Sequence, residues 1–163
     1  MKKLLFLFTI TALFSISVTA QTKNESPNVF AKSYDYVNDF EKILTPSQVK
    51  SLNDFLKSSE TKTKSKILIV TTPSINPYAD LNEYSRKLDH YMLSQLKIDT
   101  SILIVISKQL RQIQVQGVEK IRAKINDQEI KDLVASYIVP ELKKGDYYKG
   151  LQQGAAQLVK RIE

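Results

Sequence analysis

The stretch "KILIVTT", residues 66–72, decides the fold class because it joins an unbroken apolar run to β-branched residues. Such runs are typical of strands that are covered on both faces of a sheet. The stretch "SILIVIS", residues 101–107, repeats the pattern, and a helix that opens at Asp80, with Glu83 three residues later, is expected between them. This strand, helix, strand unit favours parallel neighbours joined by a right-handed crossover. The sequence therefore predicts an α/β fold.

One strand and one helix are expected on the amino-terminal side of this strand, helix, strand unit. A short strand is expected just before Asp39, and a helix is expected over residues 46–59. Thr45 suits the capping position of that helix, Pro46 suits its first turn, and Gln48 completes a capping box. Its apolar residues recur at helical spacing and form one face: Val49, Leu52, Phe55 and Leu56.

The elements on the carboxyl-terminal side complete the sheet. Residues 111–117 alternate glutamine with apolar residues, which predicts an antiparallel strand with one wet face at or near an edge. A helix is expected from Asn126, and Pro140 should end or kink it because proline lacks the amide proton that the helix needs. Gly145 and Asp146 precede a last helix. We expect a mixed sheet of about four strands sandwiched between helices, in the order βαβαββαα.

The first twenty residues predict export. Lys2 and Lys3 precede an apolar run over residues 4–18, and small residues lead to Ala20, which is the pattern of a secretory signal peptide cleaved after Ala20. The apolar run is short for a membrane-spanning helix. We therefore expect a periplasmic or secreted protein, with no membrane span once the signal peptide is removed.

The mature chain has the size and composition of one domain. Removal of residues 1–20 leaves 143 residues, and the loss of two lysines lowers the net charge from +7 to +5. The chain has no cysteine, which excludes disulfides, thiol catalysis and thiolate metal sites. Residues 21–33 are polar and predict a flexible leader, and residues 34–163 form the domain, which we expect to be a monomer. The lysines are scattered without interleaved aromatics, so we expect no nucleic-acid binding.

Several segments resemble the TPM domain family: "VND" at 37–39, "ILTPSQVKSLNDFL" at 43–56, "IDTSILIVIS" at 98–107 and "YIVPELKKGDYYKGL" at 137–151. The resemblance covers nearly the whole mature chain. Its most specific part is a proline, a glycine-aspartate-tyrosine and a glycine-leucine: Pro140, Gly145, Asp146, Tyr147, Gly150 and Leu151. The family includes exported bacterial proteins and thylakoid-lumen proteins linked to photosystem II repair. The resemblance implies acid phosphatase activity or the binding of calcium or another divalent cation.

The chain departs from the family pattern at two places. Where the family has aspartate, asparagine and glycine before the third strand, residues 99–101 are aspartate, threonine and serine. Where the family has an arginine, a strand and then glycine, tyrosine and glycine, Arg111 and Gly117 are kept but Val118 and Glu119 follow. A function that needs the glycine-rich backbone or the tyrosine ring is therefore not expected, although Glu119 adds an oxygen ligand.

The resemblance also implies a metal site. Asp39 and Asp99 match family aspartates on loops at sheet ends, and converging carboxylates repel each other unless a cation lies between them. We expect calcium, with magnesium as the alternative, bound by Asp39, Asp99, Glu119 and Thr100 together with backbone carbonyls and water. Each residue also has a structural interpretation: Asp39 as an acceptor for turn amides, and Asp99 and Glu119 as solvated charges.

Three functions remain open at this point. The favoured one is a non-catalytic, cation-binding accessory module that acts through a protein partner in the cell envelope. The second is a metal-dependent acid phosphatase that uses Asp39 or Asp99, with Arg111 gripping the phosphate oxygens. The third is a metal-free interaction domain. The only histidine, His90, lies opposite the apolar stripe of its helix and is expected to be exposed, so histidine-based catalysis is not expected.

Overall fold

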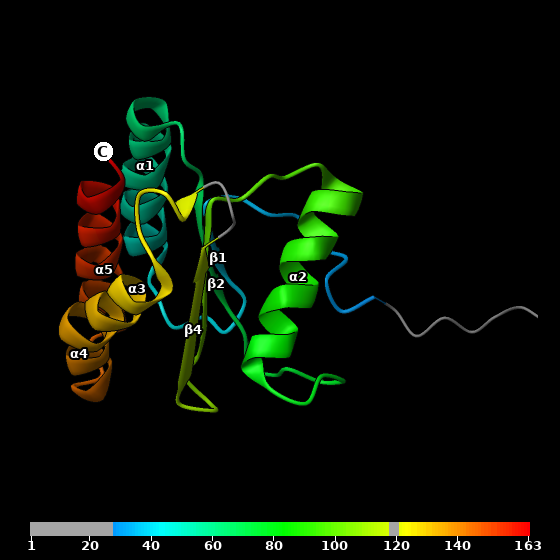
Figure 1. Cartoon of the computed structure of the whole chain (residues 1–163). Helices are drawn as coiled ribbons and strands as arrows, with labels where there is room; N and C mark the ends of the chain where they lie inside the picture. Colours follow the sequence, from blue (N-terminus) through cyan, green and yellow to red (C-terminus); the bar gives the residue numbers. More distant parts are fainter. Residues whose placement is uncertain (1–27, 118–120) are drawn as a thin grey trace, which may run out of the picture.

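The computed structural model describes residues 28–117 and 121–163, which form a four-stranded mixed sheet with helices on both faces (Figure 1). The strands lie in the order β1-β2-β3-β4; the first three are parallel and the fourth is antiparallel to β3. The predicted mixed sheet is confirmed, and so is the predicted parallel pairing of the two strands that the crossover helix connects. The strands are β1 (Val37–Asp39), β2 (Ile67–Thr71), β3 (Ile102–Ser107) and β4 (Gln112–Gly117).

Helix α2 covers one face of the sheet, and the other helices cover the opposite face (Figure 1). The predicted order βαβαββαα is confirmed, with the third helical region divided into three segments. No helix of the described residues is long and apolar enough to cross a membrane. The helices are α1 (Pro46–Thr63), α2 (Leu81–Leu96), α3 (Asp127–Leu133), the π-helical η2 (Val134–Ile138), α4 (Val139–Lys143) and α5 (Tyr147–Ile162).

The two central strands, β2 and β3, contribute side chains to two separate hydrophobic cores, one on each face of the sheet. This explains their unbroken apolar runs. Alternate residues of a strand point to opposite faces, so a strand that is covered on both faces needs an apolar residue at every position. One core lies between the sheet and α1 and α5, and includes Ile67, Ile69, Ile102 and Ile104. The other lies under α2 and includes Leu68, Val70, Leu103 and Val105.

The start of α1 follows the predicted capping box. The Thr45 hydroxyl accepts a hydrogen bond from the Gln48 backbone N–H at 3.3 Å, and the Gln48 side chain accepts one from the Thr45 N–H at 2.9 Å. The helix begins at Pro46, as predicted, and continues to Thr63, four residues beyond the expected end.

The helix before Pro140 continues through the proline instead of ending there. Segment η2 has π-helical bonding, and the Val139 N–H donates to the carbonyl of Val134 five residues back. Because proline cannot donate a backbone hydrogen bond and its ring crowds the preceding turn, regular α-helical bonding is lost at this point. The predicted interruption is confirmed, and α4 then carries the chain on to Lys143.

The segment before β1 is anchored by one aromatic residue. Phe30 is only 2% exposed, stacks on Tyr78 at 5.4 Å between ring centroids and meets Tyr84 edge-on at 5.1 Å. The expectation that the chain up to residue 33 does not pack is wrong for Phe30, because a single buried aromatic ring supplies a large apolar contact. The predicted signal peptide, residues 1–20, and the first part of the leader, residues 21–27, lie outside the described residues.

Candidate functional site: a cationic cleft

A cleft of about 1130 Å³ opens at the end of the sheet where the parallel strands finish. Its walls come from three places: the turn after β1, the β3–β4 turn, and the chain from α4 to the start of α5. In open α/β sheets, ligands bind outside the carboxyl ends of the strands, which is the position of this cleft. Its lining includes the basic residues Lys42, Lys108, Arg111, Lys143 and Lys144.

Two of the basic residues occupy left-handed backbone positions in the turns that shape the cleft. Lys42 has a φ of 56° and Arg111 has a φ of 54°. The Lys42 N–H donates to the carbonyl of Asp39 at 3.3 Å, and the Arg111 N–H donates to the carbonyl of Lys108 at 3.2 Å. Side chains other than glycine are uncommon in this conformation, and such positions are concentrated at functional sites.

Glu41 shows that the β3–β4 turn binds an anionic group. Its two carboxylate oxygens accept hydrogen bonds from the backbone N–H groups of Lys108 and Gln109, each at 2.8 Å. Glu41 is the one acidic side chain among the described residues that line the cleft. It joins the turn after β1 to the β3–β4 turn, so the cleft keeps its shape although these turns are far apart in the sequence.

Apart from Glu41, the charged side chains of the described residues that line the cleft are all basic. Lys144 forms an ion pair with Glu141 at 2.8 Å, and the Lys108 ammonium lies 5.5 Å from the centroid of the Tyr147 ring. The side chains of Lys42, Arg111 and Lys143 form no hydrogen bond or ion pair with any other residue that the structure describes. A concave surface lined by one sign of charge raises the local concentration of ligands of the opposite sign.

Asp39 has a structural role at the end of β1. Its Oδ1 accepts hydrogen bonds from the Ile43 N–H at 3.1 Å and from the Thr71 hydroxyl at 2.6 Å, and its Oδ2 accepts one from the Leu44 N–H at 2.8 Å. The carboxylate thus closes the turn that leads to α1 and ties β1 to β2. This is the structural interpretation that the sequence left open for Asp39.

The structure places Asp39 and Asp99 at opposite ends of the sheet. Asp39 is level with Thr71, and Thr71 is level with Ile106 near the end of β3. Asp99 lies three residues before Ile102, the first residue of β3, and the levels of Ile102 and Ile106 are separated by four strand steps, or about 13 Å. The expectation that the two carboxylates converge is wrong, because Asp39 ends β1 whereas Asp99 precedes the parallel strand β3.

The other predicted ligands are not brought together with Asp39 either. Thr100 is 3% exposed, and its hydroxyl donates to the Asp89 carboxylate on α2 at 2.5 Å. Glu119 lies outside the described residues. Within residues 28–117 and 121–163, no three side chains of the histidine, cysteine, aspartate and glutamate types gather in a way that could hold a metal ion.

Of the predicted site residues that the structure describes, Arg111 alone lines the cleft. No role in a binding site was predicted for Lys42, Lys108, Lys143 or Lys144. The sequence did contain a signal for these residues of the cleft. Lys108 directly follows the last residue of a buried parallel strand, and Lys42 lies three residues beyond β1, so both could be expected near the carboxyl ends of the strands. His90, expected to be exposed, is exposed on α2.

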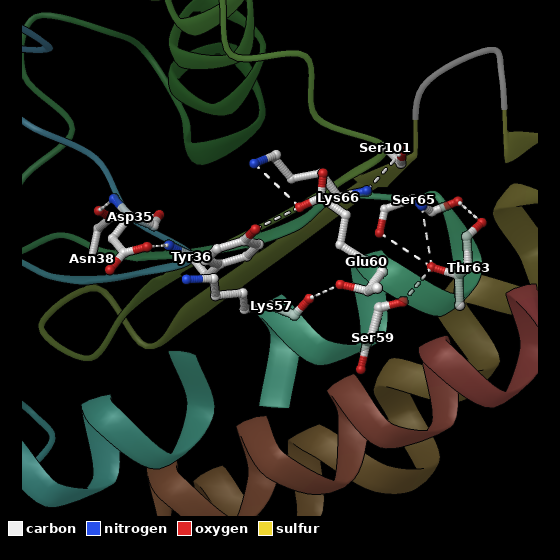
Figure 2. A network of polar contacts seen from close by, with 11 residues as sticks. Asp35, Tyr36, Asn38, Lys57, Ser59, Glu60, Thr63, Ser65, Lys66 and Ser101 are labelled. Carbon is white, nitrogen blue, oxygen red and sulfur yellow. Dashed lines mark hydrogen bonds and ion pairs between the residues drawn. The ribbon is translucent and has the colours of Figure 1, made fainter. Parts of the chain in front are cut away.

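A second polar network, shown in Figure 2, lies near the amino ends of the parallel strands. The Tyr36 hydroxyl donates to Glu60 at 2.7 Å, and the same carboxylate oxygen lies 3.2 Å from the Lys66 ammonium. The Lys66 ammonium also lies 4.6 Å from the centroid of the Tyr36 ring. The hydrogen bond to Glu60 raises the pKa of Tyr36, so the phenol stays protonated. The three side chains join β1, α1 and β2 and have a structural role.

Comparisons with known proteins agree with this architecture. The profile of the TPM domain matches residues 37–161. A search of curated proteins finds no match. Among solved structures, the N-terminal domain of a protein from P. gingivalis is similar, with 21% identity, a TM-score of 0.69 and coverage of 81% of this chain and 84% of that one.

Two further NMR structures show the same fold. The N-terminal domain of cg2496 protein from Corynebacterium glutamicum has 15% identity and a TM-score of 0.62, with 85% of each chain covered. BA42 protein from the psychrophilic bacterium Bizionia argentinensis has 17% identity and a TM-score of 0.62, with 76% of this chain and 83% of that chain covered.

Proposed function

The chain belongs to the TPM domain family, and from that premise we propose that it is an exported, non-catalytic module of the cell envelope that binds an anionic group of a partner in the cationic cleft. The signal-peptide pattern of residues 1–20 supports export. The chemistry of the cleft fits a phosphate or a carboxylate group, because both offer negatively charged oxygens to arginine and lysine side chains.

One observation carries this proposal. Lys42, Arg111 and Lys143 face a cleft of about 1130 Å³ in which backbone N–H groups already hold the carboxylate of Glu41. Because Glu41 already occupies the backbone donors of the β3–β4 turn, a bound anion would be held by the side chains of Lys42, Arg111 and Lys143.

The side chains near the cleft support binding better than hydrolysis. A general base must be able to accept a proton from the reacting group. Glu41 accepts two backbone hydrogen bonds, and Asp39 accepts two backbone hydrogen bonds and one from a hydroxyl. His90 lies on α2, which covers the other face of the sheet from α4 and α5 (Figure 1). A shared calcium site has less support, because Asp39 and Asp99 are at opposite ends of the sheet.

Phosphate titration of the mature protein tests the proposal. We expect inorganic phosphate to shift the amide resonances of Lys108, Gln109 and Arg111. We expect Arg111→Ala to weaken phosphate binding about fivefold, because a charge-assisted hydrogen bond to an exposed anion contributes about 1 kcal/mol. Arg86→Ala, a matched change on α2, should leave the affinity unchanged.

Other outcomes separate the alternatives. The absence of any phosphate-induced shift at these amides would refute the cleft as an anion site. Release of phosphate from an aryl phosphate, lost in Arg111→Ala, would favour the phosphatase function. Shifts near Asp39 and Asp99 on addition of millimolar calcium, without a response to phosphate, would favour the cation-binding function.

A further inference from the structure

Strand β4 ends the sheet and presents one unpaired edge. Among the described residues its only strand partner is β3. Figure 1 shows α2 on one side of β4 and α3 on the other, with no helix drawn across the edge itself. Unpaired strand edges readily accept another extended chain, because their N–H and C=O groups have no partner within the sheet.

The hydrogen-bonding pattern of β3 shows which backbone N–H and C=O groups of β4 point away from β3, toward the unpaired edge. The N–H of Ile102 and the carbonyl of Ile106 bond to residues on the β2 side, at Lys66 and Thr72. Leu103 and Val105 therefore bond to the glutamines opposite them in β4, Gln116 and Gln114, since bonding alternates along an antiparallel pair. The glutamines thus point their backbone groups inward, and Ile113 and Val115 point theirs outward.

The outward edge lies in a groove of about 630 Å³. The groove is bounded on one side by α2, including Arg86, and on the other by α3 and η2, including Ile130 and Val134. Ile113 and Val115 are half-buried, and no backbone hydrogen bond outside the sheet joins either of them to another described residue. The groove therefore combines a free strand edge with flanking apolar side chains, the two features of sites that bind extended peptides.

The charges of the groove favour an acidic occupant. Asp127 lies 3.9 Å from Arg122, so these two charges offset each other, whereas Asp89 accepts the Thr100 hydroxyl and keeps its negative charge. Arg86 on α2 and Lys131 on α3 are exposed and have no ion-pair partner among the described residues. The lining therefore has a net charge of +1, from three basic side chains against two acidic ones: Arg86, Arg122 and Lys131 against Asp89 and Asp127.

We propose that β4 accepts an extended, acidic segment of a partner protein as a fifth strand of the sheet. Backbone hydrogen bonds to Ile113 and Val115 hold the segment, and its carboxylates reach Arg86 and Lys131. A second copy of this chain fits less well, because a two-fold pairing of β4 with itself would bring two grooves of the same net positive charge to one seam. This surface is distinct from the cationic cleft, although the two share Ile113 and Val139.

Hydrogen exchange of the full mature protein tests the proposal directly. The probe is a synthetic peptide with blocked ends that alternates valine and glutamate, and the control peptide alternates valine and lysine. We expect the glutamate peptide to slow exchange of the Ile113 and Val115 amides by about tenfold or more at saturation, because their N–H groups become hydrogen-bonded. Equal protection by both peptides, or by neither, would overturn the proposal.

Charge-reversal variants supply the second test and leave the strand intact. We expect the double variant Arg86→Glu/Lys131→Glu to weaken binding of the glutamate peptide about tenfold through lost attraction and new repulsion. Lys42→Glu, a charge reversal in the cationic cleft, should leave the protection of the Ile113 and Val115 amides by the glutamate peptide unchanged to within about twofold, whatever binding the cleft itself loses. An equal loss in the two variants would overturn the proposal.

A backbone variant and a concentration series complete the design. Val115→Pro removes an outward N–H without removing a bond to β3, so a folded Val115→Pro protein should bind the glutamate peptide more weakly. Unchanged peptide affinity in that folded variant would overturn the proposal. Protection of Ile113 and Val115 that rises with protein concentration in the absence of peptide would assign the edge to a second copy instead.

Discussion

At the scale of single residues, Asp39 links the backbone of one turn to a neighbouring strand. Its carboxylate accepts hydrogen bonds from the Ile43 and Leu44 amides and from the Thr71 hydroxyl. We predict that Asp39→Ala lowers the free energy of unfolding by about 2–3 kcal/mol, because partly buried donors lose their acceptor. Urea denaturation measures the loss, and Asp54→Ala on the exposed face of α1 is the control, with an expected change below about 0.5 kcal/mol.

The same measurement in millimolar calcium distinguishes this role from metal ligation. A structural Asp39 gives the same loss of stability with and without calcium. If calcium stabilised the unmodified protein and Asp39→Ala abolished that gain, the carboxylate would be a ligand and its structural assignment would be incomplete.

Glu129 gives a pH-dependent prediction at the same scale. Its carboxylate accepts a hydrogen bond from the Asn126 N–H and forms an ion pair with Arg161, and these contacts, the backbone bond first, hold its pKa below the usual 4.5. The stabilisation is present above that usual pKa and is lost as the pH falls through the lowered value in the folded state. We therefore expect Glu129→Gln to flatten the fall in stability between about pH 5 and about pH 3.

Thermal melts across that pH range check the Glu129 prediction. Asp132→Asn, which changes an exposed carboxylate on the same helix, serves as the control and should keep the pH dependence of the unmodified protein. An unchanged profile in Glu129→Gln would show that the ion pair and cap do not contribute to acid sensitivity.

At the scale of elements, α5 approaches η2 closely at Gly154. A Cβ at this position would lie 2.3 Å from Cγ1 of Ile138, whose side chain is fully buried. We predict that Gly154→Ala lowers the free energy of unfolding by about 1–2 kcal/mol, because overpacking outweighs the gain of about 1 kcal/mol in helix propensity. Chemical denaturation measures the change. In an Ile138→Ala background the same substitution should be neutral or stabilising, and an additive double variant would refute the contact.

Phe30 gives a second prediction for an element, the segment that precedes β1. Its ring is buried against Tyr78 and Tyr84, and the expected cost of Phe30→Ala is about 3 kcal/mol in the free energy of unfolding. Val29→Ala, at a neighbouring position that is 39% exposed, should change stability by less than about 0.5 kcal/mol. Equal effects in denaturation experiments would mean that the segment does not anchor to the core.

The sequence was sufficient to predict the helices and strands that are marked by a pattern of neighbouring residues. The unbroken apolar runs predicted β2 and β3, and the capping box of Thr45 predicted the start of α1. Pro140 predicted an interruption of the helix, but nothing in the sequence indicated that the interruption would take the π-helical form of η2. Phe30 was missed because a single aromatic residue in a polar segment has no periodicity that marks it as buried.

At the scale of the whole molecule, the order of strands decides which loops meet. The contact of Glu41 with the Lys108 and Gln109 amides joins residues 67 and 68 positions apart, and no local pattern indicates it. The cationic cleft exists because these turns lie at the same end of the sheet. Asp39 and Asp99 do not converge for the related reason that the carboxyl end of one parallel strand and the loop before another lie at opposite ends of the sheet.

The separation of Asp39 and Asp99 leads to a last prediction, which concerns the energetic coupling between substitutions at the two positions. The two ends of the parallel strands are separated by about 13 Å, so the destabilisation caused by Asp39→Ala and by Asp99→Ala should add to within about 0.5 kcal/mol in the double variant. Two carboxylates on one cation would instead be strongly coupled, because removal of either ligand would already release the ion. Urea denaturation of the four proteins, with and without millimolar calcium, measures the coupling. A coupling energy well above 0.5 kcal/mol that appears only with calcium would place the two side chains on one ion and contradict the parallel register of β1, β2 and β3.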